Sequence, residues 1–133
     1  MFDQVLNNLP GFAMYFAAAI AILAVFLTVY TFLTPYDELA LIRQGNVAAA
    51  VSLSGTVLGI ALPVATAIAV SHNLAIMAGW GVLACVIQLA VFAAAWLALP
   101  NLAQDIPQGK VASGVFVASL SLGIGLINAA CIV

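Results

Sequence analysis

The chain has 133 residues, of which 67% are hydrophobic and only 5% are charged. Ordinary soluble domains carry roughly a quarter charged residues, so this composition excludes a conventional water-soluble protein. The formal net charge is −2 and the two basic residues form no patch, which argues against a nucleic-acid-binding protein. The apolar residues form long runs, as is typical of membrane-spanning helices.

The first apolar run, at residues 11–33, follows a short polar lead at residues 1–10. Aromatic side chains such as Phe12 and Tyr30 stand near its two ends, where membrane interfaces favour them. No basic segment precedes the run and no small-residue cleavage site follows it. We therefore interpret it as a retained span and not as a signal peptide.

A polar hinge follows the first span and begins a new element. Thr34 is a suitable N-cap and Pro35 suits the first helical position, so we expect a short interfacial helix over residues 35–44. Gly45 is placed to end this helix, and Asn46 is placed to cap the next one.

Three further spans are predicted, at residues 46–70, 74–99 and 111–132. A short loop at residues 71–73 separates the second span from the third. A second polar hinge at residues 100–110 separates the third from the fourth. Four spans put both chain termini on the same side of the membrane.

The chain contains an internal repeat. The segment at residues 42–51 recurs 64 residues later at 106–115, with Gly45 matched by Gly109. The repeats, about 11–70 and 74–132, each hold two spans and so share one orientation. The predicted fold is a single all-α integral membrane domain over residues 1–133, with four transmembrane helices arranged as two tandem parallel helical hairpins.

The basic residues predict the orientation of the chain. Arg43 and Lys110 lie in the two hinges, so the positive-inside rule places residues 34–45 and 100–110 in the cytoplasm and both termini outside. A four-span chain encloses little space, and a homodimer or a larger homo-oligomer surrounded by membrane lipids is therefore the expected assembly.

The spans carry small and polar residues at helical spacing. Two interpretations are open: close helix packing through small residues, including a GxxxG pair, or a narrow polar path. Gln88 and Asn128 are interpreted as partners of another helix or subunit, or as ligand contacts. The residues concerned are Ser52, Gly55, Thr56, Gly59, Pro63, Thr66, Gln88, Gly123, Gly125 and Asn128.

The hinges hold the best candidates for a binding site. Their acidic residues serve to cap helices and pair with Arg43, or alternatively to attract a small cation, including a polyamine. The first-hinge candidates are Asp37, Glu38, Arg43, Gly45 and Asn46, and the second-hinge candidates are Asp105, Gly109 and Lys110.

No residue pattern indicates catalysis, a cofactor or a metal site. Cys85 and Cys131 lie inside predicted spans and are interpreted as small buried thiols, and His72 as a solvated loop residue. The spans contain no Asp, Glu, Lys, Arg or His, which argues against a proton-coupled transporter. A redox role for the two cysteines is the weakest hypothesis.

Residues 34–50 and 126–131 resemble domain-of-unknown-function family 350, the YjfL-like bacterial inner-membrane proteins, and the likeness extends over nearly the whole chain. The resemblance implies a small four-span inner-membrane protein built from two repeats, in a polyamine-linked or envelope-stress system. Lys110 departs from the pattern, since an Asn is expected after Gly109. We therefore expect a non-enzymatic oligomeric accessory or scaffold protein, or alternatively a small-cation or polyamine channel.

Overall fold

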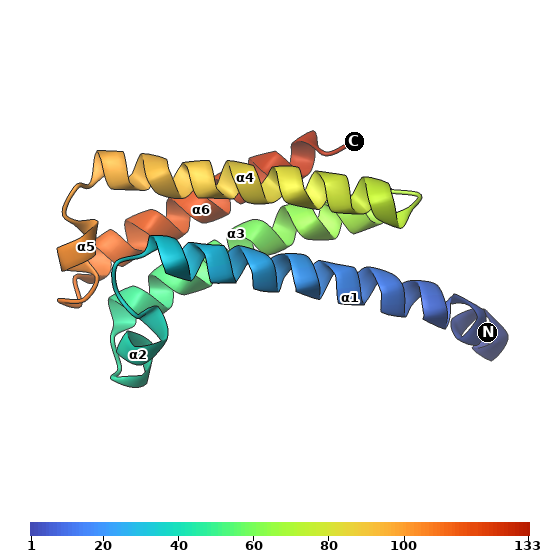
Figure 1. The fold of residues 1–133 in the computed structure, drawn as a ribbon, viewed down its shortest axis with the longest axis horizontal. Helices are drawn as coiled ribbons and strands as arrows, with labels where there is room; N and C mark the ends of the chain where they lie inside the picture. Colours follow the sequence, from blue (N-terminus) through green and yellow to red (C-terminus); the bar gives the residue numbers. More distant parts are fainter.

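The computed structural model describes residues 1–133 and consists of helices joined by short turns (Figure 1). Four of the helices are long and apolar enough to cross a membrane. The predicted all-α class with four spans is confirmed. The helices are α1 (Phe2–Leu33), α2 (Glu38–Arg43), α3 (Val47–Val70), α4 (Leu74–Ala98), α5 (Leu102–Asp105) and α6 (Val111–Cys131).

The first helix is longer than expected. It begins at Phe2 and continues through Pro10, whereas the predicted span began at residue 11. A proline removes one backbone donor, and Asp3 in the first turn complements the helix dipole. Its 32 residues correspond to about 48 Å at 1.5 Å per residue, so its N-terminal turns project past the end of α3 (Figure 1).

The short helix of the first hinge starts later than expected. Thr34 has an extended backbone, with ψ 134°, because the residue before a proline is kept out of the helical region. It ends α1 instead of beginning α2, its backbone N–H donating to the Tyr30 carbonyl. Asp37 is the N-cap of α2 and accepts a hydrogen bond from the Ala40 N–H at 3.2 Å.

The helices α3 and α6 form the centre of the bundle and make the most extensive contact in it. The helix α4 packs on both, and α1 lies against α3 and α4. Both hinges, with α2 and α5, lie at one end of the bundle (Figure 1). The two termini and the α3–α4 turn lie towards the other end. The candidate site residues of the two hinges are thereby brought to one end.

Glycines allow α3 and α6 to approach closely. A Cβ atom on Gly114 would lie 2.5 Å from the Ala48 carbonyl oxygen, and one on Gly59 would lie 2.5 Å from the Ser121 carbonyl oxygen. Contacts this close exclude any larger residue at these positions. In a membrane, where lipid is as apolar as the helices, such backbone contact is what holds helices together.

Candidate functional site

Both hinges end in the same turn. Gly45 and Gly109 adopt positive φ angles of 86° and 78°, which glycine reaches without strain. The following residue closes each turn: the Asn46 N–H donates to the Leu41 carbonyl at 2.9 Å. The Lys110 N–H makes the equivalent bond to the Asp105 carbonyl at 3.0 Å. These bonds complete Schellman motifs. The first-hinge helix α2 therefore ends before Gly45, as the sequence predicted, whereas the short helix α5 in the second hinge was not predicted.

The two hinges are joined by the Asn46 side chain. Its amide donates to the carbonyl oxygens of Ile106 at 2.9 Å and Pro107 at 3.2 Å in the second hinge. Its oxygen accepts from the Ala49 N–H at 3.0 Å and caps α3. One residue therefore starts the central helix and ties together segments that are 60 residues apart.

Glu38 is the unexpected residue of the first hinge. As the first residue of α2 it turns into the bundle, and only 1% of its surface is exposed. Neither carboxylate oxygen has a hydrogen-bond partner. It makes no ion pair with Arg43, which is exposed, so the pairing weighed from the sequence does not form. A buried charged group without a partner carries a large desolvation penalty.

Hydroxyl groups of α1 and α3 are also left unpaired in this region. The Tyr30 hydroxyl and the Ser52 hydroxyl are both buried without a hydrogen-bond partner. Thr56, one turn beyond Ser52, donates its hydroxyl to the Ser52 carbonyl at 3.0 Å. Sequence reasoning assigned Tyr30 to a membrane interface and missed its place beside Glu38. No periodic signal in the chain pairs these two residues.

Burial changes the acid–base behaviour of the hinge. It raises the pKa of the Glu38 carboxyl from 4.5 to about 7. The nearby Tyr30 hydroxyl lowers the pKa of Glu38 by a smaller amount, although the two groups do not meet hydrogen-bond geometry. Burial and the neighbouring Glu38 also raise the pKa of Tyr36 above its ordinary value. Glu38 is therefore a carboxyl that titrates near neutral pH, while Tyr36 stays neutral there.

Asp37 differs from Glu38 in its exposure to solvent. It lies at the surface beside a hollow of about 380 Å³ that both acidic residues help to line. The other lining residues are Thr31, Phe32, Thr34, Pro35, Tyr36 and Leu39. One carboxylate is thus in solvent and the next one along the chain is inside the bundle.

The second hinge contains a conventional ion pair instead. Lys110 Nζ lies 3.2 Å from Asp105 Oδ1, and the Ser113 hydroxyl donates to Asp105 Oδ2 at 3.1 Å. The position 64 residues after Glu38 is Leu102, which is also 1% exposed. The two hinges share their turns but not their chemistry.

The polar residues of the spans lie mainly between helices. The Gln88 amide of α4 donates to the Ser121 carbonyl of α6 at 3.1 Å. The Asn128 amide of α6 donates to the Ala84 carbonyl of α4 at 3.5 Å. The sequence left open whether Gln88 and Asn128 bond another helix, another subunit or a ligand. In the structure both bond a neighbouring helix of the same chain. The remaining oxygen of Gln88 is buried and has no partner.

The small residues divide between two environments. Gly55, Gly59 and Gly125 lie in the α3–α6 contact, where an added Cβ would overlap the facing helix. Gly123 is exposed and has nothing within 4 Å of an added Cβ. On α3, Pro63 is buried, and Thr66 donates its hydroxyl to the Leu62 carbonyl at 3.1 Å.

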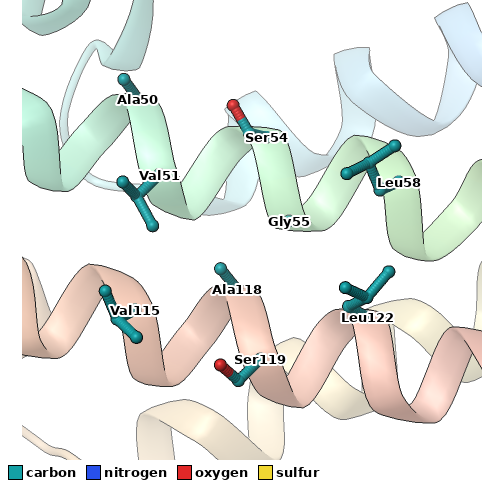
Figure 2. A pocket seen from close by; sticks show the side chains of 9 residues that line it. All are labelled: Ala50, Val51, Ser54, Gly55, Leu58, Val115, Ala118, Ser119 and Leu122. Carbon is teal, nitrogen blue, oxygen red and sulfur yellow. The ribbon is translucent and has the colours of Figure 1, made fainter.

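A shallow groove of about 400 Å³ runs along the line where α3 meets α6 (Figure 2). Apart from Ala50, the residues of its two walls occupy matching positions 64 apart in the chain. From α3 these are Ala50, Val51, Ser54, Gly55 and Leu58, and from α6 they are Val115, Ala118, Ser119 and Leu122. The lining is mostly apolar, as expected of a surface that faces lipid.

The cysteines are unpaired. Cys85 is half-buried, but Cys131 is exposed at the end of α6, so its expected burial is wrong. It is the last residue of α6, so no further turn of that helix follows it. His72 is exposed in the α3–α4 turn. No three side chains of His, Cys, Asp or Glu gather where they could hold a metal ion.

A protein-family model described as Domain of Unknown Function (DUF350) matches residues 4–132. The chain belongs to the DUF350 family. The UPF0719 inner membrane protein YjfL of Escherichia coli (strain K12) is 37% identical over 128 residues, covering 96% of this chain and 97% of that protein. The UPF0719 transmembrane protein YshE of Bacillus subtilis (strain 168) is 32% identical over 126 residues, covering 93% and 94%.

No solved structure matches this DUF350 chain. The names of its relatives state a membrane location and no activity. Together with the four apolar helices, they identify the chain as a multi-pass membrane protein of the kind found in the bacterial inner membrane.

Proposed function

We propose that this DUF350 protein is a non-enzymatic membrane protein that lets small cations pass, with the acidic first hinge as its mouth. The observation that carries the proposal is the buried Glu38 carboxyl, which no basic side chain neutralises. An ionisable group buried among membrane helices is costly, and such groups commonly mark substrate or ion pathways. Its single negative charge selects for cations.

The order of polar groups supports entry from the hinge end. Asp37 stands in solvent beside the surface hollow and attracts cations from solution. Glu38 follows inside the bundle, and the hydroxyls of Ser52 and Thr56 come next along α3. We place this mouth in the cytoplasm on the basis of Arg43 and Lys110. A conducting form built from two or more copies would complete the path beyond these residues.

Inorganic cations and polyamines make different demands on this mouth. A polyamine carries several positive charges along a flexible chain, so it needs the exposed Asp37 carboxylate as well as Glu38. An inorganic cation needs only Glu38 and neighbouring oxygens. Family resemblance to a polyamine-linked system makes the polyamine worth testing, and the buried position of Glu38 favours the inorganic ion.

A second candidate is an oligomeric accessory or scaffold protein in an envelope-stress or polyamine-linked system. The observation that favours it is α1, whose N-terminal end projects past the α3–α4 turn (Figure 1). Two exposed rings of α1, Phe12 and Phe16, also stack with 5.7 Å between their centres. The glycines between α3 and α6 already pack against each other's helices within the chain and are not free to contact a second protein. A partner or second copy would therefore bind along α1.

Cation flux into proteoliposomes tests the first candidate. We expect flux of sodium, potassium or a polyamine above that of empty liposomes, and loss of that excess in the Asp37→Asn/Glu38→Gln double variant. Asp105→Asn is the matched control, because it removes a carboxylate from the second hinge and should leave flux unchanged. Flux equal to empty liposomes for all three cations would refute the proposal.

Crosslinking in membranes tests the second candidate independently. Cysteines introduced along the outward side of α1, for example at Phe12 or Phe16, should join copies or capture a constant partner if α1 is the contact. The scaffold candidate is refuted if no such position crosslinks the chain to a second copy or to a partner.

A further inference from the structure

Four buried oxygen atoms at the first hinge have no partner within the protein. They are the two carboxylate oxygens of Glu38, the Tyr30 hydroxyl and the Ser52 hydroxyl. The three side chains are 1%, 0% and 1% exposed, and they come from α2, α1 and α3. Leaving one polar group unsatisfied in an apolar interior costs free energy, and leaving four together is unusual.

The Tyr30 hydroxyl lies near enough to Glu38, Ser52 and Thr56 to interact with them, but none of the four oxygens has a partner at hydrogen-bond geometry. The Thr56 hydroxyl is donated to the Ser52 carbonyl, and the Thr34 hydroxyl to the Thr31 carbonyl at 3.0 Å. The charged residues nearest in sequence, Asp37 and Arg43, point to solvent. The structure's one ion pair lies in the other hinge.

The second hinge shows that an apolar side chain suffices at this place in the backbone. The residue 64 positions after Glu38 is Leu102, and those after Tyr30 and Ser52 are Ala94 and Phe116. Leu102 is as deeply buried as Glu38. The polar cluster is therefore not needed to form the turn that both hinges share.

We propose that Glu38, Tyr30 and Ser52 form a binding site for one monovalent alkali-metal cation, which competes with a proton for the Glu38 carboxylate. Carboxylate and hydroxyl oxygens are hard donors of the type that such cations accept. One carboxylate balances one positive charge. A divalent ion such as calcium takes six to eight oxygens, usually with several carboxylates, and no such cluster is present.

The competing proton follows from the titration of the site. The Glu38 carboxyl has a pKa of about 7, so near neutral pH it is protonated in about half of the molecules when no cation is bound. The groups that face it are Tyr30 from α1 and Tyr36 from the hinge, while α3 contributes only the hydroxyls of Ser52 and Thr56. A tyrosine hydroxyl ordinarily titrates near pH 10, so cation binding near neutral pH displaces the proton of Glu38 alone.

This inference rests on the proposed function in naming the ion, but its test measures binding and not transport. A hydrophobic carbodiimide, dicyclohexylcarbodiimide, adds across a protonated buried carboxyl to give a stable acylurea that mass spectrometry detects. We expect one label per chain, at Glu38, in choline chloride at pH 7. Sodium chloride at ten times its half-effective concentration should slow labelling about tenfold by mass action.

Three variants make the test specific. Glu38→Gln should lose the label. Tyr30→Phe and Ser52→Ala should keep the label, with sodium protecting them only at several-fold higher concentration. Glu38→Leu places at this position the residue type that Leu102 provides in the second hinge. This variant should elute like the wild-type protein in size-exclusion chromatography in detergent, which would show that loss of the label is not loss of the fold.

The outcomes separate this inference from the proposed function. A folded wild-type protein that is not labelled, or is labelled equally fast in choline, lithium, sodium and potassium, overturns the cation site. Protection by sodium without flux in proteoliposomes keeps the site and overturns the transport proposal. Equal protection of wild type and Tyr30→Phe or Ser52→Ala overturns the assigned hydroxyls.

Discussion

Gly125 of α6 lies against the backbone carbonyl of Gly59 in α3, at a point where no Cβ atom fits. The proline four residues after Gly59, Pro63, has no N–H to bond that carbonyl within the helix. The carbonyl oxygen is therefore free on the side that faces α6, and the small Gly125 lets the second helix approach it.

Gly125→Val should therefore destabilise the bundle. Inserting a branched side chain into a packed contact costs about 1–3 kcal/mol, and here the obstacle is backbone that cannot move aside. We expect a loss of about 3 kcal/mol in the free energy of unfolding, measured by denaturant titration in detergent. Gly123→Val is the matched control, since its Cβ meets nothing within 4 Å. Equal losses in both variants would contradict this packing.

Asn46→Ala should weaken both hinges at once. The variant loses the cap of α3 and the two bonds to the Ile106 and Pro107 carbonyls. We expect a loss of about 2 kcal/mol, of which the cap contributes about 1. Hydrogen exchange of the second hinge should also speed up. Asn73→Ala, which removes only the cap of α4, should cost about 1 kcal/mol and leave hinge exchange unchanged.

The stability of the protein should fall as pH rises from 4.5 to 7. The folded state holds the Glu38 proton up to a pKa of about 7, whereas the unfolded chain releases it near 4.5. Below pH 4.5 Glu38 is protonated in both states, and the protein has its full stability. Between pH 4.5 and 7 only the folded state keeps the proton, so about 3 kcal/mol of stability is lost by pH 8. The measurement is denaturant unfolding in choline buffers free of alkali cations.

Two variants decide whether Glu38 is responsible for that slope. Glu38→Gln should flatten the profile between pH 4.5 and 7 and exceed the wild-type stability at pH 8. Asp37→Asn should keep the wild-type slope, because asparagine caps a helix about as well as aspartate. A slope that survives Glu38→Gln would assign it to another group.

Cys131 can report which way the chain crosses the membrane. It is exposed at the end of α6, at the terminus that the positive-inside rule places outside. A membrane-impermeant maleimide should label it in spheroplasts, and Cys131→Ser should abolish labelling because Cys85 is half-buried. Gln108→Cys in that background should react only after permeabilisation. The reverse pattern would invert the proposed orientation.

Much of the fold is predictable from the sequence because its signals are local. Apolar runs predicted α3, α4 and α6 to within one residue at each end. Gly45 and Asn46 predicted where α2 ends and α3 begins, since a positive φ and a cap each involve a few adjacent residues. The predicted start of α2 was wrong because the Thr34 hydroxyl donates to the Thr31 carbonyl of α1, and Asp37 caps α2 instead.

The candidate site divides in the same way. The sequence by itself identified the acidic first hinge and its difference from the second, because both are statements about residue type and spacing. It could not show that Asp37 is in solvent while Glu38 is buried beside Tyr30 and Ser52. That depends on how α2 folds back against α1 and α3, which is decided by packing between segments far apart in the chain. Only the tertiary structure showed that one of the two adjacent acidic residues, Glu38, is a buried carboxyl without a partner.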